Sequence, residues 1–199
     1  MKQISITYYI IKCRFMRGLL LLADGFEDTE ALTTRDVLIR AGIEITTASI
    51  TDRREVQSSF GVFVLADALL KLVFDTTPYD FLVLPGGGRG THNLGESQLV
   101  AMYIEKFVKA NKLVCAICAA PSILGKLGYL ANEKYTCFAG CNVGFAGDFT
   151  GNEVEVSGNF ITARSMRYSI PFALTIIEKL LGTAARERVE IGLNGQTAK

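Results

Sequence analysis

The chain has 199 residues, 49% of them apolar, which is enough to bury one substantial core. Its 21 basic and 20 acidic residues are interspersed, so we expect no nucleic-acid partner. No apolar run reaches the roughly 18–20 residues of a membrane-spanning helix, so we expect no membrane partner either. Five cysteines are an odd number for a disulfide framework and favour a reducing, cytoplasmic location.

The first fifteen residues do not read as a signal peptide. Lys12 and Arg14 follow their short apolar run, where a cleavage site would need small residues. Met16 directly precedes the first convincing strand. We therefore predict that translation starts at Met16 and that residues 1–15 are a mis-called extension, with a dispensable tail as the alternative. Residues 16–199 are predicted to form a single domain.

From Met16 onward, predicted strands alternate with predicted helices. The strands are expected at residues 18–23, 43–49, 81–84, 113–117, 135–138, 154–156 and 160–164, with a hairpin-like region through Val56 and 62–65. The helices are expected at about 27–40 and 96–110, after Cys118, and at 169–182, followed by an amphipathic tail at 184–193. This alternation predicts a doubly wound α/β fold, a mostly parallel sheet sandwiched by helices.

The stretch 112–124, KLVCAICAAPSIL, carries the strongest sign of chemistry. An apolar run ends at Cys118, and Ala119, Ala120 and Pro121 are predicted to form the first turn of a helix. A nucleophile at such an elbow has a strained backbone and lies at the carboxyl edge of the sheet. Because a helix amino terminus favours thiolate, we predict a Cys118 pKa well below the usual value of about 8.5. The alternative is a buried structural cysteine.

Three loops are predicted to meet at this edge of the sheet, namely 24–30, 85–90 and 118–121. They contribute a carboxylate, a glycine turn with free N–H groups, and a thiol. Taken in this order, ADGFEDTEA, LVLPGGGRGTHNL and VCAICAAP resemble the DJ-1/ThiJ/PfpI superfamily, and its DJ-1/ThiJ branch in particular. The stretches RAGIEITTASI, ADALL and FALTIIEKLLG extend the resemblance over nearly all of 16–182. It implies a flavodoxin-like, class I glutamine amidotransferase-like fold with its nucleophile elbow at Cys118.

The resemblance also implies roles for individual residues. Cys118 matches the reactive, oxidation-prone cysteine, and Glu30 matches the acid that hydrogen-bonds to its sulfur. The backbone N–H groups of Gly87 and Ala119 match the pair that would bind an oxyanion. Next to a thiolate, Glu30 is expected to have a raised pKa and to keep its proton. Without the resemblance, Glu30 would read as a solvated acid in the first turn of a helix.

Two arginines are weaker candidates. Arg40 and Arg164 align with arginines that lie near the site or the dimer interface in the resembling family. The chain departs from the family pattern after Arg164, where Ser165, Met166 and Arg167 replace a Gly-Pro-Gly.

Histidines that relatives place near the cysteine are replaced here by Ala119 and Phe138. A Cys/His pair cannot be built locally, and we expect no peptidase activity. The only histidine, His92, is placed on the loop after the glycines, where it either approaches Cys118 as an auxiliary group or is simply exposed.

The remaining motifs are given no cofactor or metal. Cys115 and Cys118 form a C-x-x-C, but Cys115 lies within the strand and is expected to point to the opposite face and belong to the core. Cys137 and Cys141 have a spacing seen in metal sites but lack further ligands. The glycines at 86–88 are not followed by the Gly-Lys-Ser/Thr of a phosphate-binding loop.

Two classes of function remain open. One is a cofactor-independent, glyoxalase III-like or deglycase-like enzyme that acts on small α-oxoaldehydes or their adducts through Cys118. The other is a non-enzymatic peroxide sensor or redox-regulated chaperone, in which oxidation of Cys118 is the function. The resemblance further implies a homodimer that packs around the helix bearing Glu30, next to the apolar stretch 62–65.

Overall fold

The computed structural model describes residues 15–73 and 79–197. The predicted amino-terminal extension therefore lies, except for Phe15, outside the described residues. No helix in the described part of the chain is long and apolar enough to cross a membrane.

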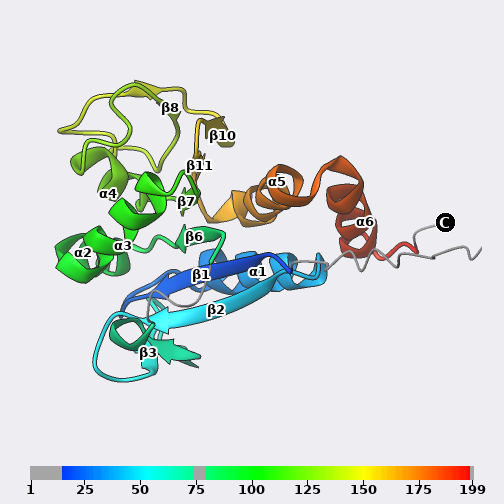
Figure 1. Cartoon of the computed structure of the whole chain (residues 1–199), viewed down its shortest axis with the longest axis horizontal. Helices are drawn as coiled ribbons and strands as arrows, with labels where there is room; N and C mark the ends of the chain where they lie inside the picture. Colours follow the sequence, from blue (N-terminus) through cyan, green and yellow to red (C-terminus); the bar gives the residue numbers. More distant parts are fainter. Residues whose placement is uncertain (1–14, 74–78, 198–199) are drawn as a thin grey trace, which may run out of the picture.

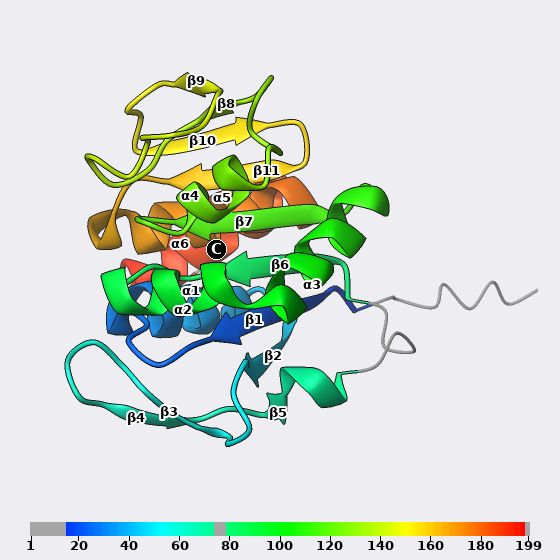
Figure 2. The same ribbon diagram turned by 90° about the vertical axis from the view of Figure 1, so that its left-hand side faces the viewer.

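A seven-stranded sheet forms the centre of the protein, in the order β10-β11-β7-β6-β1-β2-β5 (Figure 2). All its strand pairs are parallel except that of β10 with β11. The strands are β1 (Arg17–Leu22), β2 (Glu44–Ser49), β5 (Ala68–Leu69), β6 (Phe81–Leu84), β7 (Leu113–Ile117), β10 (Val154–Ser157) and β11 (Phe160–Ala163). The predicted doubly wound, flavodoxin-like α/β fold is confirmed.

Helices cover both faces of the sheet (Figures 1 and 2). One face carries α1 (Asp28–Arg40), α5 (Ser169–Leu181) and α6 (Thr183–Leu193), and the other carries α2 (Gly88–Glu96), α3 (Gln98–Lys109) and α4 (Pro121–Lys126). Alternation along β1 divides its leucines between the two layers, because successive strand side chains point to opposite faces. Leu20 and Leu22 pack with α1 and α5, whereas Leu19 and Leu21 pack with α3 and α4.

Two small sheets lie outside the central one. The predicted hairpin is present as β3 (Glu55–Gln57) paired antiparallel with β4 (Phe63–Leu65). A strand was predicted at 135–138, but the observed strand, β8 (Lys134–Tyr135), starts one residue earlier and has two residues. It pairs with β9 (Asp148–Phe149). Single 3-10 turns occur at Leu70–Leu72 and Met166–Tyr168.

The region after β6 differs from the prediction. Residues 88–96, read as a glycine loop, form helix α2, and a second helix, α3, starts after Ser97. The glycines are compatible with a helix here because they allow close packing: a side chain on Gly90 would lie 2.7 Å from the Gly25 carbonyl oxygen. Ser97 ends one helix and caps the next, its hydroxyl accepting from the Val100 N–H at 3.3 Å.

The strand order places the candidate site. From β1 the chain winds outward to β2 and β5, then returns to β6 on the other side of β1 and winds away through β7 and β11. The carboxyl ends of β1 and β6 therefore form a topological switch point, where doubly wound folds bind their ligands. The loops after β1, β6 and β7 all open at this edge.

Candidate active site

The loops after β1 and β6 are held together by backbone hydrogen bonds. The Glu27 N–H donates to the Gly86 carbonyl at 3.1 Å, and the Gly90 N–H donates to the Gly25 carbonyl at 2.9 Å. Gly87 has a φ of 88°, and a side chain there would lie 2.4 Å from the Gly25 carbonyl oxygen. Only glycine fits this position, which fixes where its N–H points.

Cys118 occupies the predicted elbow at the end of β7. Its φ is 63°, a left-handed conformation that costs energy for a residue with a side chain. Two neighbours hold it there: its N–H donates to the Ala163 carbonyl at 2.8 Å, and its carbonyl accepts from the Phe138 N–H at 2.7 Å. Helix α4, however, begins only at Pro121, so Cys118, Ala119 and Ala120 form a turn before the helix instead of its first turn.

Glu30 lies in the first turn of α1, and its side chain is completely buried. Its Oε2 accepts from the Gly86 N–H at 2.8 Å, and its carboxyl interacts with the Cys118 thiol. The second oxygen, Oε1, is buried and has no hydrogen-bond partner of ordinary geometry within the described residues. The interpretation of Glu30 as a solvated acid is therefore wrong.

Gly86 makes this meeting possible, and sequence reasoning gave it no role of its own. A side chain there would lie 2.5 Å from the Glu30 Oε2 and 2.8 Å from the Cys118 Cβ. The signal that could have found it is its position as the first glycine after β6, where two neighbouring loops converge.

Burial raises the pKa of Glu30 from its usual value of 4.5 to about 7, and the Glu27 carboxylate adds to the rise. The contacts with Cys118 and with the Gly86 N–H act in the opposite direction. The predicted direction of this pKa shift is confirmed, but burial is its main cause. At neutral pH the group therefore exists in both its acid and its carboxylate form, as a residue that moves protons requires.

The predicted low pKa of Cys118 is wrong. Burial raises the pKa of this thiol first, and the Glu30 charge and the hydrogen bond to Glu30 raise it further. The N–H groups of Ala119 and Gly87 lower the pKa of Cys118, but by less than burial and Glu30 raise it. The helix amino terminus contributes less than predicted because α4 begins only at Pro121. Because two adjacent negative charges repel each other, Cys118 and Glu30 titrate as a coupled pair. The thiolate form of Cys118 therefore occurs together with the protonated form of Glu30.

The backbone N–H groups of Gly87 and Ala119 both act on the Cys118 sulfur. They come from the loops after β6 and β7 and converge on the nucleophile without any side chain. An oxygen attached to a carbon on this sulfur would lie beside the same two donors, the arrangement of an oxyanion hole. The structure thus brings together Cys118, Glu30, Gly87 and Ala119, as predicted, while their catalytic roles stay predictions.

Comparison with known proteins identifies the lineage of this site. The sequence profile of the DJ-1/PfpI family matches residues 16–179. The chain belongs to the DJ-1/PfpI family. It is 35% identical over 181 residues to the Parkinson disease protein 7 homolog of Danio rerio, covering 89% of this chain and 96% of that protein. It is 30% identical over 167 residues to the glutathione-independent glyoxalase DJR-1.2 of Caenorhabditis elegans, covering 82% and 88%. The solved structure of oxidized Toxoplasma gondii DJ-1 superimposes with a TM-score of 0.83 at 30% identity, covering 92% of this chain and 100% of that one.

Of the other described cysteines of this DJ-1/PfpI protein, two are more deeply buried than Cys118 and one is half-buried, as Cys118 is. Cys115 and Cys137 are completely buried, and Cys141 is half-buried. Cys115 belongs to the core, as predicted, but it packs on the same side of the sheet as Cys118. The left-handed backbone of Cys118 interrupts the strand alternation from which we predicted opposite faces. Among the described residues, no group of three or more histidine, cysteine or acidic side chains gathers to hold a metal ion.

The two arginines do not join the site. Arg40 lies in the last turn of α1, about 15 Å from Glu30 at a helical rise of 1.5 Å per residue, and pairs with Asp36 at 2.8 Å. Arg164 donates to the Gly151 carbonyl at 2.9 Å and to the Tyr168 hydroxyl, over whose ring it stacks. A role for either at a dimer interface stays a prediction.

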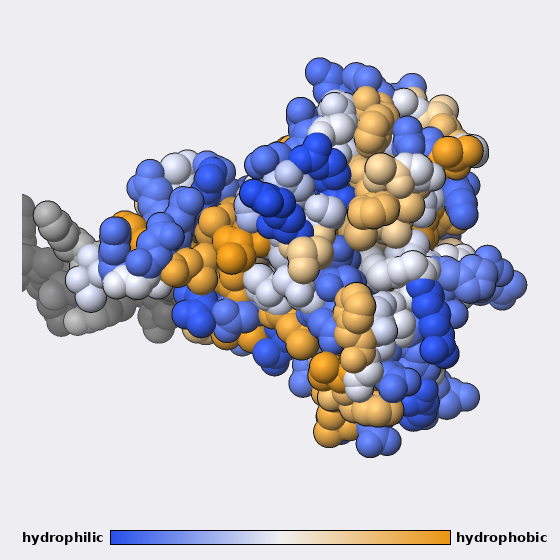
Figure 3. Space-filling model, turned by 180° about the vertical axis from the view of Figure 1, so that it is seen from behind, coloured by the Kyte–Doolittle hydropathy of each residue, from blue (hydrophilic) through white to orange (hydrophobic). Residues whose placement is uncertain are grey.

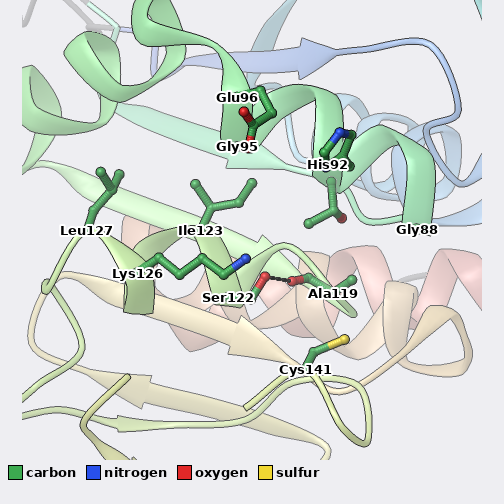
Figure 4. Close-up of a pocket in the computed structure, with 11 residues that line it drawn as sticks. Gly88, His92, Gly95, Glu96, Ala119, Ser122, Ile123, Lys126, Leu127 and Cys141 are labelled. Atoms are coloured by element: carbon green, nitrogen blue, oxygen red, sulfur yellow. Dashed lines mark hydrogen bonds between the residues drawn. The ribbon is translucent and has the colours of Figure 1, made fainter. Parts of the chain in front are cut away.

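His92 lies on α2, not on a loop, and its exposed ring faces a cavity of about 300 Å³ between α2 and α4 (Figure 4). The cavity begins beside the site, because Ala119 and Gly88 line it and are the chain neighbours of Cys118 and Gly87. Its other walls come from residues that sequence reasoning gave no role: Thr91, Glu96, Ser122, Lys126 and Cys141 among them. Ser122 and Lys126 could have been noticed, since they lie one helical turn apart just after the elbow.

Proposed function

We propose that this protein is a cofactor-independent glyoxalase, which converts a small α-oxoaldehyde and water into a 2-hydroxy acid. The observation that carries the proposal is the buried Glu30, with its pKa near 7, against the side chain of Cys118. The C. elegans relative named as a glutathione-independent glyoxalase supports it. Glu30, Cys118, Gly87 and Ala119 supply a proton carrier, a nucleophile and two oxyanion donors.

The first step would be attack of the Cys118 sulfur on the aldehyde carbon. The reactive state holds a thiolate beside a protonated Glu30, and the attack forms a C–S bond while the aldehyde oxygen gains negative charge. The N–H groups of Gly87 and Ala119 stabilise this oxygen, and a proton from Glu30 completes a hemithioacetal. Glu30 is then a carboxylate.

The second step would use that carboxylate as a base. Glu30 removes the proton from the former aldehyde carbon and returns a proton to the neighbouring carbon. The hydroxyl proton of the hemithioacetal passes to the oxygen on that neighbouring carbon, and the product is a thioester of the 2-hydroxy acid. Water cleaves the thioester, releasing the acid and restoring the thiol. A group with a pKa near 7 suits both directions of proton transfer at neutral pH.

The decisive experiment is lactate formation from methylglyoxal without added thiol. Turnover by the purified protein that is lost in Cys118→Ala and strongly reduced in Glu30→Gln is the expected result. A rate equal to that of the Cys118→Ala control would overturn the proposal.

A second candidate, a peroxide sensor or redox-regulated chaperone, is favoured by the unpaired Oε1 of Glu30. When protonated, this buried oxygen could donate to an oxygen added to the Cys118 sulfur, stabilising the sulfinic acid. The Toxoplasma gondii relative has been solved in an oxidized form. Peptide mass spectrometry after limited peroxide treatment should find Cys118 oxidised before the buried Cys115 and Cys137. Equal oxidation of all three would contradict this function.

We further propose that the protein is a cytoplasmic homodimer. The β3–β4 hairpin and the neighbouring surface of α1 expose large apolar side chains, and orange gathers at this end of the molecule, at the lower right of Figure 3. Exposed fractions of these side chains are 78% for Phe60, 49% for Val62, 64% for Phe63, 63% for Leu65 and 38% for Leu32. A monomer would leave this patch in water.

A further inference from the structure

We propose that Cys137 and Cys141 are a redox-active pair, which closes to a disulfide by exchange with a low-molecular-weight disulfide such as oxidised glutathione. The pair acts on the candidate site through the backbone, because the turn between the two cysteines is hydrogen-bonded to Cys118. Neither thiol takes part in the proposed glyoxalase chemistry, so the inference does not depend on that chemistry.

The chain folds back on itself between the two cysteines. The Cys141 N–H donates to the Phe138 carbonyl at 3.0 Å, and Gly140 has a φ of 83°. This hydrogen bond closes a tight four-residue turn, whose end residues have Cα atoms within about 7 Å of each other. Cys137 directly precedes the turn and Cys141 ends it. Disulfides need Cα atoms about 4.4–6.8 Å apart, a spacing that a tight turn can supply.

The electrostatics of the two thiols also place them close together. Burial raises the pKa of Cys137 to about 12, and the charge of the Cys141 thiolate adds to the rise. Both side chains pack against the same part of the core, the one between the sheet and helices α3 and α4. The two sulfurs therefore lie within one small region behind the elbow.

The two cysteines differ in exposure, and this difference assigns their roles. Cys137 is completely buried. Cys141 is half-buried and lines the cavity of about 300 Å³ together with Ala119 and Lys126 (Figure 4). Burial raises the pKa of Cys141, but the Lys126 charge lowers it. Cys141 is therefore the thiol that a dissolved disulfide can reach, and Cys137 is the thiol that resolves the product.

The exchange has two steps. The Cys141 thiolate attacks one sulfur of oxidised glutathione, which forms a mixed disulfide and releases one glutathione thiolate. The Cys137 thiol gives its proton to that thiolate and attacks the Cys141 sulfur, which releases the second glutathione and leaves the intramolecular disulfide. One glutathione disulfide is reduced to two thiols while two protein thiols are oxidised. Excess reduced thiol reverses both steps.

The turn connects this pair to the nucleophile. The Phe138 N–H donates to the Cys118 carbonyl at 2.7 Å, one of the two hydrogen bonds that hold the left-handed backbone of Cys118. Closing the disulfide draws the ends of the turn together and moves this N–H. Cys118 then relaxes towards ordinary strand angles, because its present conformation costs energy. Its sulfur turns away from the two backbone N–H groups that favour its thiolate, and we expect it to react more slowly.

The test treats the full-length protein with oxidised glutathione at pH 8, blocks free thiols by alkylation and analyses tryptic peptides by mass spectrometry. Both cysteines of the pair fall in peptide 135–164, because Lys134 precedes it and the next basic residue, Arg164, ends it. Cys118 falls in peptide 113–126. We expect the first peptide to be unalkylated and lighter by two hydrogens. A disulfide between the two peptides, or a glutathione adduct that never closes, would overturn the proposal.

Substitutions separate the two steps. Cys137→Ala should stop the reaction at the mixed disulfide on Cys141. Lys126→Gln should slow the first step, since it removes the cation that favours the Cys141 thiolate. Lys179→Gln removes an exposed lysine on α5 and should leave the rate of closure unchanged. Closure at an unchanged rate in Lys126→Gln would show that Cys141 is not the attacking thiol.

The effect on the nucleophile is measured by the rate at which iodoacetamide alkylates Cys118. We expect this rate to fall about tenfold in the disulfide form, as for a rise of one pKa unit, and to recover after dithiothreitol. Cys141→Ser, treated in the same way, cannot close the disulfide and shows any direct reaction of glutathione with Cys118. An equal rate in the open and closed forms would refute the link to the site. Neither measurement requires turnover, so both are independent of the proposed function.

Discussion

Glu30 and Cys118 meet across Gly86, and the lack of a side chain at Gly86 is the condition for their contact. Glu30 lies in the first turn of α1, which follows β1, while Gly86 and Cys118 lie just beyond the ends of β6 and β7. These three strands are neighbours in the sheet. The Gly86 N–H holds one carboxyl oxygen of Glu30, and the other is buried without a hydrogen-bond partner among the described residues. The geometry of this pair therefore depends on the backbone at Gly86 as well as on the two side chains.

Gly86→Ala should disable the site. Its new methyl group would lie 2.5 Å from the Glu30 Oε2, 2.8 Å from the Cys118 Cβ and 3.0 Å from the Ile117 carbonyl oxygen, so the pair must move apart. A displacement of about 1 Å at reacting groups can lower a rate by roughly 100-fold. The measurement is kcat/KM for methylglyoxal, with Gly192→Ala, where a methyl group meets no atom within 4 Å, as the control. Retained activity in Gly86→Ala would show that the close pair is not required.

The raised pKa of Glu30 makes stability depend on pH. Between pH 4.5 and about 7 the folded protein keeps a proton on Glu30 that the unfolded chain has released, so the free energy of unfolding falls as pH rises through this window. The full shift corresponds to about 3 kcal/mol. Glu30→Gln, which is neutral throughout, should remove this loss. Urea unfolding of both proteins at pH 5, 6, 7 and 8 measures the difference. A constant difference between them across this range would mean that Glu30 titrates normally.

The sequence predicted the parts of this site that depend on strand order and on short-range patterns. The apolar run 113–117, followed by small residues, was sufficient to place the elbow at Cys118, whereas Glu30 was assigned to the site only through the resemblance to the DJ-1 family. What it could not predict depends on burial. The Cys118 pKa is set by how deeply the sulfur lies and by the charge of Glu30, and neither can be obtained from spacing.

Helix α2 was missed for a similar reason. Glycines have low helix propensity, so residues 88–96 looked like a loop. The helix exists because Gly90 packs against the backbone of Gly25 and Phe26, and Leu94 is buried in the core. Tertiary contacts therefore override local propensity here, and they also place His92 on a cavity wall that sequence reasoning could not foresee.

Charged substitutions in the hairpin should dissociate the proposed dimer. Phe63→Glu and Leu65→Glu place a carboxylate where each protomer would bury an apolar side chain, worth about 2 kcal/mol per large side chain. Light scattering at micromolar concentration should give a dimer mass for the unmodified protein and a monomer mass for the double variant. Met102→Glu changes a side chain on α3 that is equally exposed, at 63%, and should remain dimeric. A monomer mass for the unmodified protein would refute the dimer.

Glu30→Gln should separate the reactivity of the Cys118 thiol from turnover. Because the Glu30 charge raises the pKa of Cys118, its removal lowers that pKa, and each unit gives roughly a tenfold larger thiolate fraction. Alkylation of Cys118 by iodoacetamide at pH 8 should therefore become faster in Glu30→Gln, while lactate formation falls because glutamine cannot move protons. A Cys141→Ser background removes from the assay the other half-buried thiol in the described part of the chain. If alkylation and turnover instead fall together, the acid form of Glu30 is what activates the thiol, and its main role is to hold the thiolate rather than to carry protons.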